Sequence, residues 1–397
     1  MKTRNPKKGV KIMLTSLFGL ILVLVMVVFL ASGIVSKPKY LEPWEKTYSD
    51  QFDDPRIKLA AHGMLAANGH NMQPWKIKLD TDPNVFYLYA DPERLAPEVD
   101  PYARQTMITQ GTFLEYVVVA GEKLGYSTEI TLFPDGQYDE NDLENSMATK
   151  PVAKITISKS EPQVSSLYDD MFLPDTNRAP YAKTELTPEQ IQRLVAINSD
   201  SDLKLNIYQD EANKTKLGNF AIEGAKIESG IHRINEESAA IFRANEYQKN
   251  EYRYGFSVEG QGTTGIMKHV MQGLLTLFPN MNNEKSSADL FVTSTENAVN
   301  NTPAYAMIIS NTNSREEQVK SGMLYSRLVL TAHSLGLVMQ PPSQVLEEYP
   351  EMREQYTAIH HEYAAEGGTI QMFFRIGTPT QEFPNSMRRD VTDLIIH

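Results

Sequence analysis

The apolar positions of the chain form one long unbroken run near the N-terminus and shorter periodic segments after it. The run extends from Ile12 to Val35 and is long enough to cross a bilayer as a helix. Basic residues precede it, which favours a cytoplasmic N-terminus. We therefore predict a basic flank (1–11), a transmembrane helix (12–35) and a short polar tether (36–50).

This reading places the chain in the cell membrane as a single-pass protein, with the lipid bilayer as one partner and the soluble part on the extracytoplasmic side. A cleaved signal peptide is the alternative. The apolar run is long for a signal peptide, and Ala31-Ser32-Gly33 is a weak cleavage candidate.

A helix and a hairpin are the first elements predicted after the tether. Asp53-Asp54-Pro55 has the acidic residues and the proline typical of a helix start, and the apolar spacing that follows predicts a helix that stops near Gly69. Alternating apolar residues then predict strands over 75–79 and 86–89, separated by a turn at 81–84. The two strands together predict a β-hairpin.

Two apolar helical segments, which begin at Gly111 and Gly322, align without gaps and form an internal repeat. A strand pattern precedes each helix and another closes each half of the chain. We predict an α+β protein of two halves, over 51–165 and 166–397, each with a sheet packed against helices. Chance similarity between two apolar helices is the alternative explanation.

The most informative polar segment runs from Asn68 to Trp75, between the first helix and the hairpin. It carries histidine, asparagine and glutamine side chains beside a backbone that Gly69 leaves approachable, which suits a planar heterocycle that needs several hydrogen bonds. The alternative is a polar turn stiffened by Pro74, with Trp75 in the core. From the residue pattern alone, both interpretations stay open.

The segment resembles the Asn-x-Gln-Pro-Trp element of the nitroreductase-like flavoprotein family, in which this element borders FMN. A second fragment, Asp175 to Tyr181, is similar to the arginine-containing element that holds the FMN phosphate in that family. A guanidinium offers a planar fork of donors to a phosphate, so Arg178 is our candidate phosphate ligand. The alternative is an ordinary surface arginine.

The C-terminal region also resembles the family, because Arg375-Ile376-Gly377 is followed by the basic pair Arg388-Arg389. In the family a basic pair approaches the phosphate, and the sequence leaves open which of the two arginines, if either, reaches it. By analogy, two consecutive prolines lie over the flavin ring, although they also suit the end of a strand. The candidate cofactor-binding residues are Asn68, Gly69, His70, Asn71, Gln73, Asn177, Arg178, Pro341, Pro342, Arg388 and Arg389.

The order and spacing of these motifs resemble the Acg-like branch of the family, in which two nitroreductase-like halves are fused in one chain. The resemblance implies a monomeric pseudo-dimer with one complete FMN site between the halves. Two stretches, Asn250 to Gly265 with its four glycines and the polar Asn280 to Pro303, look like mobile, lid-like insertions in the second half. Ordinary surface loops are the alternative.

The resemblance implies an FMN-dependent oxidoreductase that passes hydride from NADPH or NADH to small electron-poor acceptors such as nitro compounds or quinones. The flavin carries the hydride, so no catalytic side chain and no metal site is predicted. The chain has no cysteine, which excludes thiol catalysis, and its net charge of −12 argues against a nucleic-acid partner. The alternatives are a non-catalytic flavin-sequestering protein and a membrane-tethered scaffold with a decayed pocket.

Overall fold

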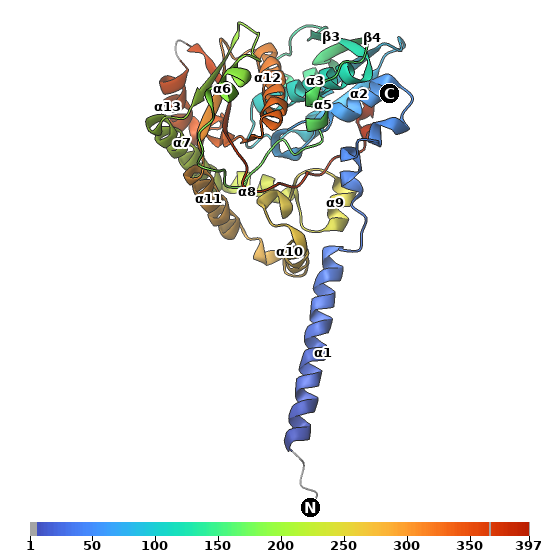
Figure 1. The fold of residues 1–397 in the computed structure, drawn as a ribbon, viewed down its shortest axis with the longest axis vertical. Helices are drawn as coiled ribbons and strands as arrows, with labels where there is room; N and C mark the ends of the chain where they lie inside the picture. Colours follow the sequence, from blue (N-terminus) through green and yellow to red (C-terminus); the bar gives the residue numbers. More distant parts are fainter. Residues whose placement is uncertain (1–5, 365–366, 397) are drawn as a thin grey trace, which may run out of the picture.

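The computed structural model describes residues 6–364 and 367–396, and its N-terminal helix extends from a rounded body like a stalk (Figure 1). This helix is α1 (Pro6–Ser32), and its most apolar part is Met13–Ser32, with a mean hydropathy of 2.9. One helix is therefore long and apolar enough to span a membrane. A signal sequence at an N-terminus has the same properties.

The segment predicted as a polar tether is instead packed into the body. Its short helical turns are η1 (Lys39–Trp44) and η2 (Tyr48–Gln51), and the side chains of Tyr40, Trp44 and Tyr48 are buried. Trp44 Nε1 donates a hydrogen bond to the Ser386 carbonyl over 2.8 Å. Burial of these three aromatic side chains removes a large apolar area from water, and this packs the segment against the body despite its polar composition.

The first sheet has the strand order β11-β1-β2-β4-β3, and all of its pairs are antiparallel except the parallel pair of β1 and β11. The strands are β1 (Trp75–Leu79), β2 (Val85–Ala90), β3 (Tyr126–Leu132), β4 (Ala153–Lys159) and β11 (Ile395–Ile396). The predicted hairpin is confirmed as β1 and β2. The end of the chain supplies β11, so the first sheet is completed by C-terminal residues.

The first helix of the body is α2 (Pro55–Gly63), and its predicted start is confirmed. The Asp54 side chain accepts a hydrogen bond from the Arg56 backbone amide over 2.9 Å, which caps the helix. The predicted end near Gly69 is wrong by six residues, because the chain leaves the helix after Gly63 and forms a separate turn, η3 (Gly69–Asn71).

The second sheet has the order β5-β8-β10-β9, with every pair antiparallel. Its strands are β5 (Leu203–Tyr208), β8 (Ala304–Ser310), β9 (Val338–Gln340) and β10 (Thr369–Gly377). In each sheet a long helix joins the second strand to the third: α3 (Arg104–Leu124) in the first and α12 (Arg315–Ser334) in the second. The fold is α+β, as predicted, and β1-β2-β4-β3 repeats as β5-β8-β10-β9.

The helices α3 and α12 pack against each other between the two sheets (Figure 1). A Cβ atom on Gly111 would lie 1.8 Å from the Val319 carbonyl oxygen, and one on Gly322 would lie 1.9 Å from the Ile108 carbonyl oxygen. The alignment that pairs Gly111 with Gly322 also pairs Ile108 with Val319. The two close backbone contacts are therefore reciprocal, and each requires glycine.

A long insertion separates β5 from β8. It contains α7 (Glu211–Ser229), α8 (His232–Ala240), β6 (Phe242–Arg243), α9 (Glu246–Tyr252), β7 (Phe256–Ser257), α10 (Gly265–Leu277) and α11 (Glu284–Asn300). The remaining helices are α4 (Leu143–Thr149), α5 (Ser166–Asp170), α6 (Pro188–Val195) and α13 (Arg353–Tyr363). The interpretation of Asn280 to Pro303 as a loop-like insertion is wrong, because most of it is α11, which begins at the Asn283 cap and packs along α7.

Candidate functional site

The loop between α2 and β1 has an unusual backbone. His70, Asn71 and Gln73 all adopt left-handed conformations, with φ of 51°, 52° and 53°. A residue other than glycine in this region costs on the order of 1 kcal/mol or more, and such residues cluster at ligand sites. The Asn68 side-chain oxygen accepts a hydrogen bond from the Gln73 amide over 2.8 Å, and the Gly69 amide donates to Thr109 Oγ1 over 3.3 Å. The loop therefore has a fixed shape rather than that of a loose turn.

The amide side chains of this loop bind other parts of the protein. Asn71 Nδ2 donates to the carbonyls of Gly255 and Met387, each over 3.2 Å. Gln73 Nε2 donates to the Arg253 carbonyl over 2.8 Å, and Gln73 Oε1 accepts from the Arg389 amide over 2.9 Å. These side chains join the insertion and the C-terminal tail to the loop. The sequence pattern predicts that these amides face a heterocycle, whereas here their hydrogen bonds go to the backbone of the protein.

The C-terminal basic pair is also engaged by the protein. Arg388 Nη2 donates to the carbonyls of Leu65 and Ala66 over 2.6 and 3.1 Å, and its guanidinium lies 4.6 Å from the Trp44 ring centre. Arg389 Nη2 donates to the Asp393 carbonyl over 2.7 Å. Burial lowers the pKa of both guanidinium groups to about 10. Through these hydrogen bonds, Arg388 and Arg389 hold the C-terminal tail against the body.

Arg178 and His70 come together from distant parts of the sequence. Burial lowers the pKa of His70 to about 4, and the nearby Arg178 guanidinium lowers it further in the same direction. The His70 ring is therefore neutral at physiological pH, and its buried Nδ1 has no hydrogen-bond partner among the described residues. The pairing of the two predicted segments is thus present in the fold.

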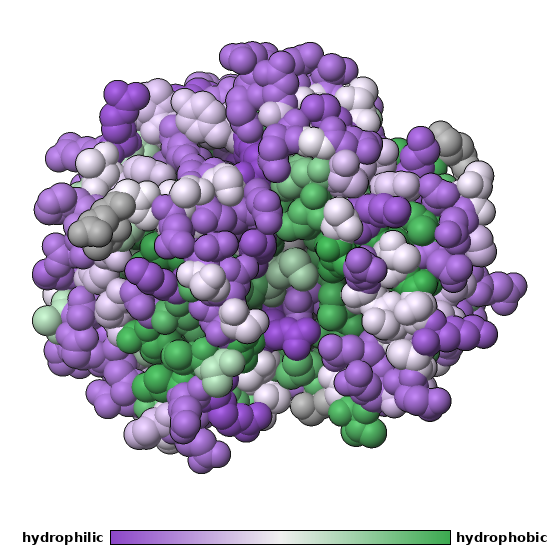
Figure 2. Space-filling view, turned by 90° about the horizontal axis from the view of Figure 1, so that it is seen from above, coloured by the Kyte–Doolittle hydropathy of each residue, from purple (hydrophilic) through white to green (hydrophobic). Residues whose placement is uncertain are grey.

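The Arg178 side chain is reached by solvent and is also surrounded by protein. Its side chain is exposed to solvent, while neighbouring protein atoms lower its pKa by desolvation. The groups that act on it are Tyr181, Arg375 and Tyr325, and none of them is a carboxylate. Figure 2, which views the body from the side opposite α1, shows a hollow near the centre of that face, bordered by hydrophobic residues.

The turn that carries Arg178 is held by Arg375 and by Asn177, which is itself one of the candidate cofactor-binding residues. Arg375, on β10, donates to the Ala179 carbonyl over 2.7 Å, and its guanidinium lies 3.8 Å from the Tyr181 ring centre. Asn177 is buried, and its side chain donates to the Gln381 carbonyl over 3.0 Å and accepts from the Ala179 amide over 2.9 Å. Asn177 and Arg375 therefore shape the turn, while the Arg178 side chain is exposed to solvent.

The two prolines follow β9 directly. This strand ends at Gln340, and Pro342 precedes the helical turn η7 (Ser343–Leu346). The backbone amide of Asn177 donates to the Met339 carbonyl over 2.9 Å, which brings the Arg178 turn alongside the strand that leads into Pro341. The prolines end the strand, one of the two roles expected for them, and they lie next in sequence to a strand that borders the site.

Part of the insertion closes on the His70 loop. We define residues 253–256 as the lid segment. The Gly255 amide donates to the Asn71 carbonyl over 3.1 Å, and the Phe256 ring lies 5.2 Å from the His70 ring, centre to centre. An aromatic residue within a glycine-containing insertion was the only sequence signal for this contact.

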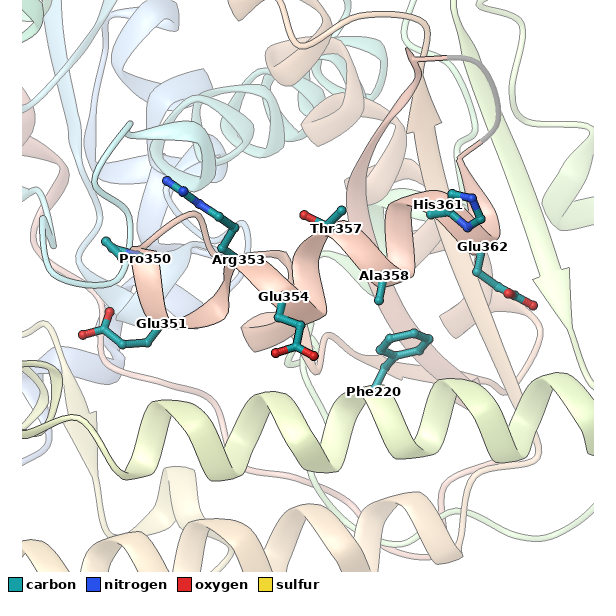
Figure 3. Close-up of a pocket in the computed structure, with 9 residues that line it drawn as sticks. All are labelled: Phe220, Pro350, Glu351, Arg353, Glu354, Thr357, Ala358, His361 and Glu362. Carbon is teal, nitrogen blue, oxygen red and sulfur yellow. The ribbon is translucent and has the colours of Figure 1, made fainter.

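Two open grooves lie elsewhere. One, of about 830 Å³, lies between α7 and α13 and contains none of the predicted site residues (Figure 3). The other, of about 630 Å³, lies where the lid segment meets the C-terminal tail and includes Arg389. The carboxylates of Glu351, Glu354 and Glu362 line the first groove, so it is a poor match for a phosphate.

No family model and no curated protein matches the chain. Among solved structures, the chain is similar to the FMN-dependent nitroreductase NfnB from Mycobacterium smegmatis in complex with NADPH, with a TM-score of 0.30 and 12% identity over 52% of this chain and 84% of that one. It is also similar to a nitroreductase-like family protein from Bacillus cereus, with a TM-score of 0.31 and 13% identity over 59% and 96%.

A third similar structure is oxidised iodotyrosine deiodinase bound to FMN and 3-iodo-L-tyrosine, with a TM-score of 0.31 and 15% identity over 56% of this chain and 95% of that one. These similarities are too weak to carry an argument about cofactor or activity. Both have to be argued from the residues of the chain itself.

The neutral state of His70 predicts a pH dependence of stability. Its folded pKa of about 4 lies below the usual value of 6.5, so the unfolded chain binds more protons between these two pH values. The free energy of unfolding should therefore fall as the pH drops from 7.5 to 5. In His70→Asn, which suits the left-handed backbone, this fall should be smaller by about 1–2 kcal/mol. Urea unfolding of the two flavin-free proteins at both pH values measures the difference, and identical pH dependence would contradict a buried neutral His70.

Proposed function

We propose that the chain is a membrane-anchored flavoprotein that binds FMN, with Arg178 as the principal phosphate ligand. The carrying observation is the Arg178 guanidinium itself, a solvent-exposed charge close to His70 with no carboxylate among the groups that act on its pKa. No hydrogen bond or ion pair ties it to another side chain in the described part of the chain. The guanidinium can give its planar fork of donors to a phosphate, which would supply the counter-charge that no carboxylate of the chain provides.

Further features near Arg178 suit a flavin. His70 is neutral, its Nδ1 has no hydrogen-bond partner among the described residues, and its loop has the left-handed backbone of His70, Asn71 and Gln73. When bound, FMN supplies the hydride chemistry, accepting hydride from NADPH or NADH and passing electrons to acceptors such as nitro compounds or quinones. The residues of the chain bind and orient the cofactor, and the lid segment limits the access of water.

We also propose that the chain is a pseudo-dimer of two related halves. The shared strand order of the two sheets and the reciprocal contacts of Gly111 and Gly322 support this proposal. In a symmetric dimer, a contact from residue i to residue j is repeated from j to i, and the two glycine contacts follow this rule. The candidate site draws on both halves, with His70 from the first and Arg178 from the start of the second.

The same proposal places α1 across the cell membrane, with the body on the extracytoplasmic side. The apolar length of α1 and the lysines that precede it support this orientation. Lys2 and Arg4, which belong to the basic flank, lie outside the described residues.

A flavin-sequestering protein is the second candidate. The hydrogen bonds between the lid segment and Asn71, together with the packing of Phe256 on His70, favour it. A lid that stays closed would keep nicotinamides and acceptors away from the flavin. The two functions share one cofactor and differ in whether the lid opens.

The proposal is tested on the full chain, purified in detergent and given FMN. The expected result is a bound flavin with a structured absorption band that bleaches when NADPH or NADH is added without oxygen. Bound flavin that stays oxidised with both donors, but bleaches with dithionite, would replace the reductase with the sequestering protein. A chain that retains no FMN after gel filtration would contradict both candidates.

A further inference from the structure

Helix α10 presents its polar residues to the protein. Lys268, Gln272 and Thr276 are spaced four residues apart and so lie on one helix face. Gln272 Nε2 donates to Glu246 Oε1 over 2.9 Å, and Lys268 Nζ lies 3.1 Å from the same oxygen. Thr276 Oγ1 accepts from the Asn245 side chain over 3.0 Å. The inward face of α10 is therefore charged and hydrogen-bonded.

The outward side of α10 and of the turn after it, η6 (Pro279–Met281), is apolar. Its exposed side chains are Ile266 (71% exposed), Met267 (55%), Leu277 (40%), Phe278 (56%) and Met281 (49%). A helix on a water-facing surface has the opposite arrangement, with apolar residues inward and polar residues outward. Several large apolar side chains gathered on one exposed surface indicate an environment other than water.

This apolar surface adjoins helix α1. A Cβ atom on Gly273 would lie 2.0 Å from the Val28 carbonyl oxygen, so the backbones of α10 and α1 touch there. Ser32 Oγ lies 3.4 Å from His269 Nδ1 at the same junction. Val28 is four residues before the end of α1, which corresponds to about 6 Å along the helix axis. Figure 1 places α10 beside the body end of α1.

The geometry points to α10 and η6 as a second membrane contact, in which their apolar surface lies in the lipid leaflet that surrounds the body end of α1. Interfacial helices bury their apolar face about 5–10 Å into the boundary between headgroups and acyl chains, a depth that matches the position of Val28. The inference rests on the proposed membrane anchor and is independent of FMN. It fixes the body against the bilayer at two places and sets its orientation.

The contact also ties the insertion that carries the lid segment to the membrane. Lys268 of α10 lies 3.4 Å from Glu259 Oε1, and Glu259 pairs with the buried Lys249 of α9. The lid segment lies between these two residues in sequence. A membrane-bound α10 therefore holds both ends of the segment that closes on His70.

The test places single tryptophans in the full chain and reconstitutes it in phosphatidylcholine vesicles with or without brominated acyl chains, which quench tryptophan on contact. The two native tryptophans, Trp44 and Trp75, are buried in the body and give a constant background. In Phe278→Trp and Ile266→Trp, brominated lipid should reduce the added emission about twofold. The ratio between the two vesicle types cancels any quenching by flavin.

Two control variants make the result decisive. Val164→Trp adds a fully exposed residue on the loop between β4 and α5, which lie far from α1 in Figure 1, and should not be quenched. Leu22→Trp, within α1, should be quenched strongly. Quenching in Leu22→Trp without quenching in Ile266→Trp and Phe278→Trp would overturn the second contact alone. Unquenched emission from the last two variants that shifts with protein concentration would also overturn it, because a second copy of the chain would then cover the surface.

No quenching at Leu22 would overturn the membrane anchor and the second contact together. FMN binding, read from the absorption spectrum of the same samples, reports separately on the flavin proposal.

Discussion

Alanine in place of Gly111 should destabilise the protein by about 3 kcal/mol. In an ordinary helix this change is favourable by up to about 1 kcal/mol, because alanine has the higher helix propensity. Here the new Cβ atom would lie 1.8 Å from the Val319 carbonyl oxygen, so α3 and α12 must move apart and lose packing along their length. Urea unfolding of the full chain in detergent, followed by tryptophan fluorescence, measures the loss.

The reciprocal geometry sharpens this prediction. Gly322→Ala should cost a similar amount, since its Cβ would lie 1.9 Å from the Ile108 carbonyl oxygen. The double variant should cost less than the sum, because one displacement of the helices relieves both clashes. Gly260→Ala is the matched control and should change stability little, as no atom lies within 4 Å of its Cβ position. Wild-type stability in Gly111→Ala would rule out this helix contact.

Methionine in place of Arg178 should weaken FMN binding about 10- to 100-fold, the loss expected when a hydrogen bond to a charged group is removed. The flavin-free protein should keep its stability or gain some, because the substitution removes a confined charge without a carboxylate partner. Fluorescence titration of the full chain with FMN measures affinity, and urea unfolding without flavin measures stability.

Two further variants separate a phosphate ligand from a structural arginine. Arg178→Lys keeps the charge but loses the planar fork of donors, so it should bind FMN with intermediate affinity. Arg193→Met, at an exposed position of α6, should leave affinity unchanged. Wild-type affinity in Arg178→Met would remove the observation on which the flavin proposal rests, and a large loss of stability would assign Arg178 a structural role.

The parts of the fold that the sequence predicted depend on local signals. The Asp54 cap, the hairpin of β1 and β2 and the apolar helices α3 and α12 are set by residues within a few positions of one another. The internal repeat also gave the correct order of strand, helix and strand around α3 and α12. Local signals failed for α11, whose polar composition hid a helix that is stabilised by packing on α7.

The sequence indicated candidate residues for the site, which remain a prediction, and it did not indicate their contacts. The resemblance of two short motifs indicated His70 and Arg178, and the fold brings them close enough for one to act on the pKa of the other. The partners of Asn71 and Gln73 come from the insertion and the C-terminal tail, 180 to 316 positions away. No local pattern reports such pairings, because they depend on how whole elements pack.

The sequence by itself determined an apolar helix at the N-terminus and the α+β class, and it led to the prediction of a repeated unit and of an FMN site at a polar loop and an arginine. Tertiary structure alone decided that β11 completes the first sheet, that residues 36–50 pack into the body and that Arg388 and Arg389 bind backbone carbonyls. It also decided that α10 turns its polar face inward. Secondary structure follows from short-range periodicity and capping, whereas the direction of a side chain depends on partners that only the folded chain brings together.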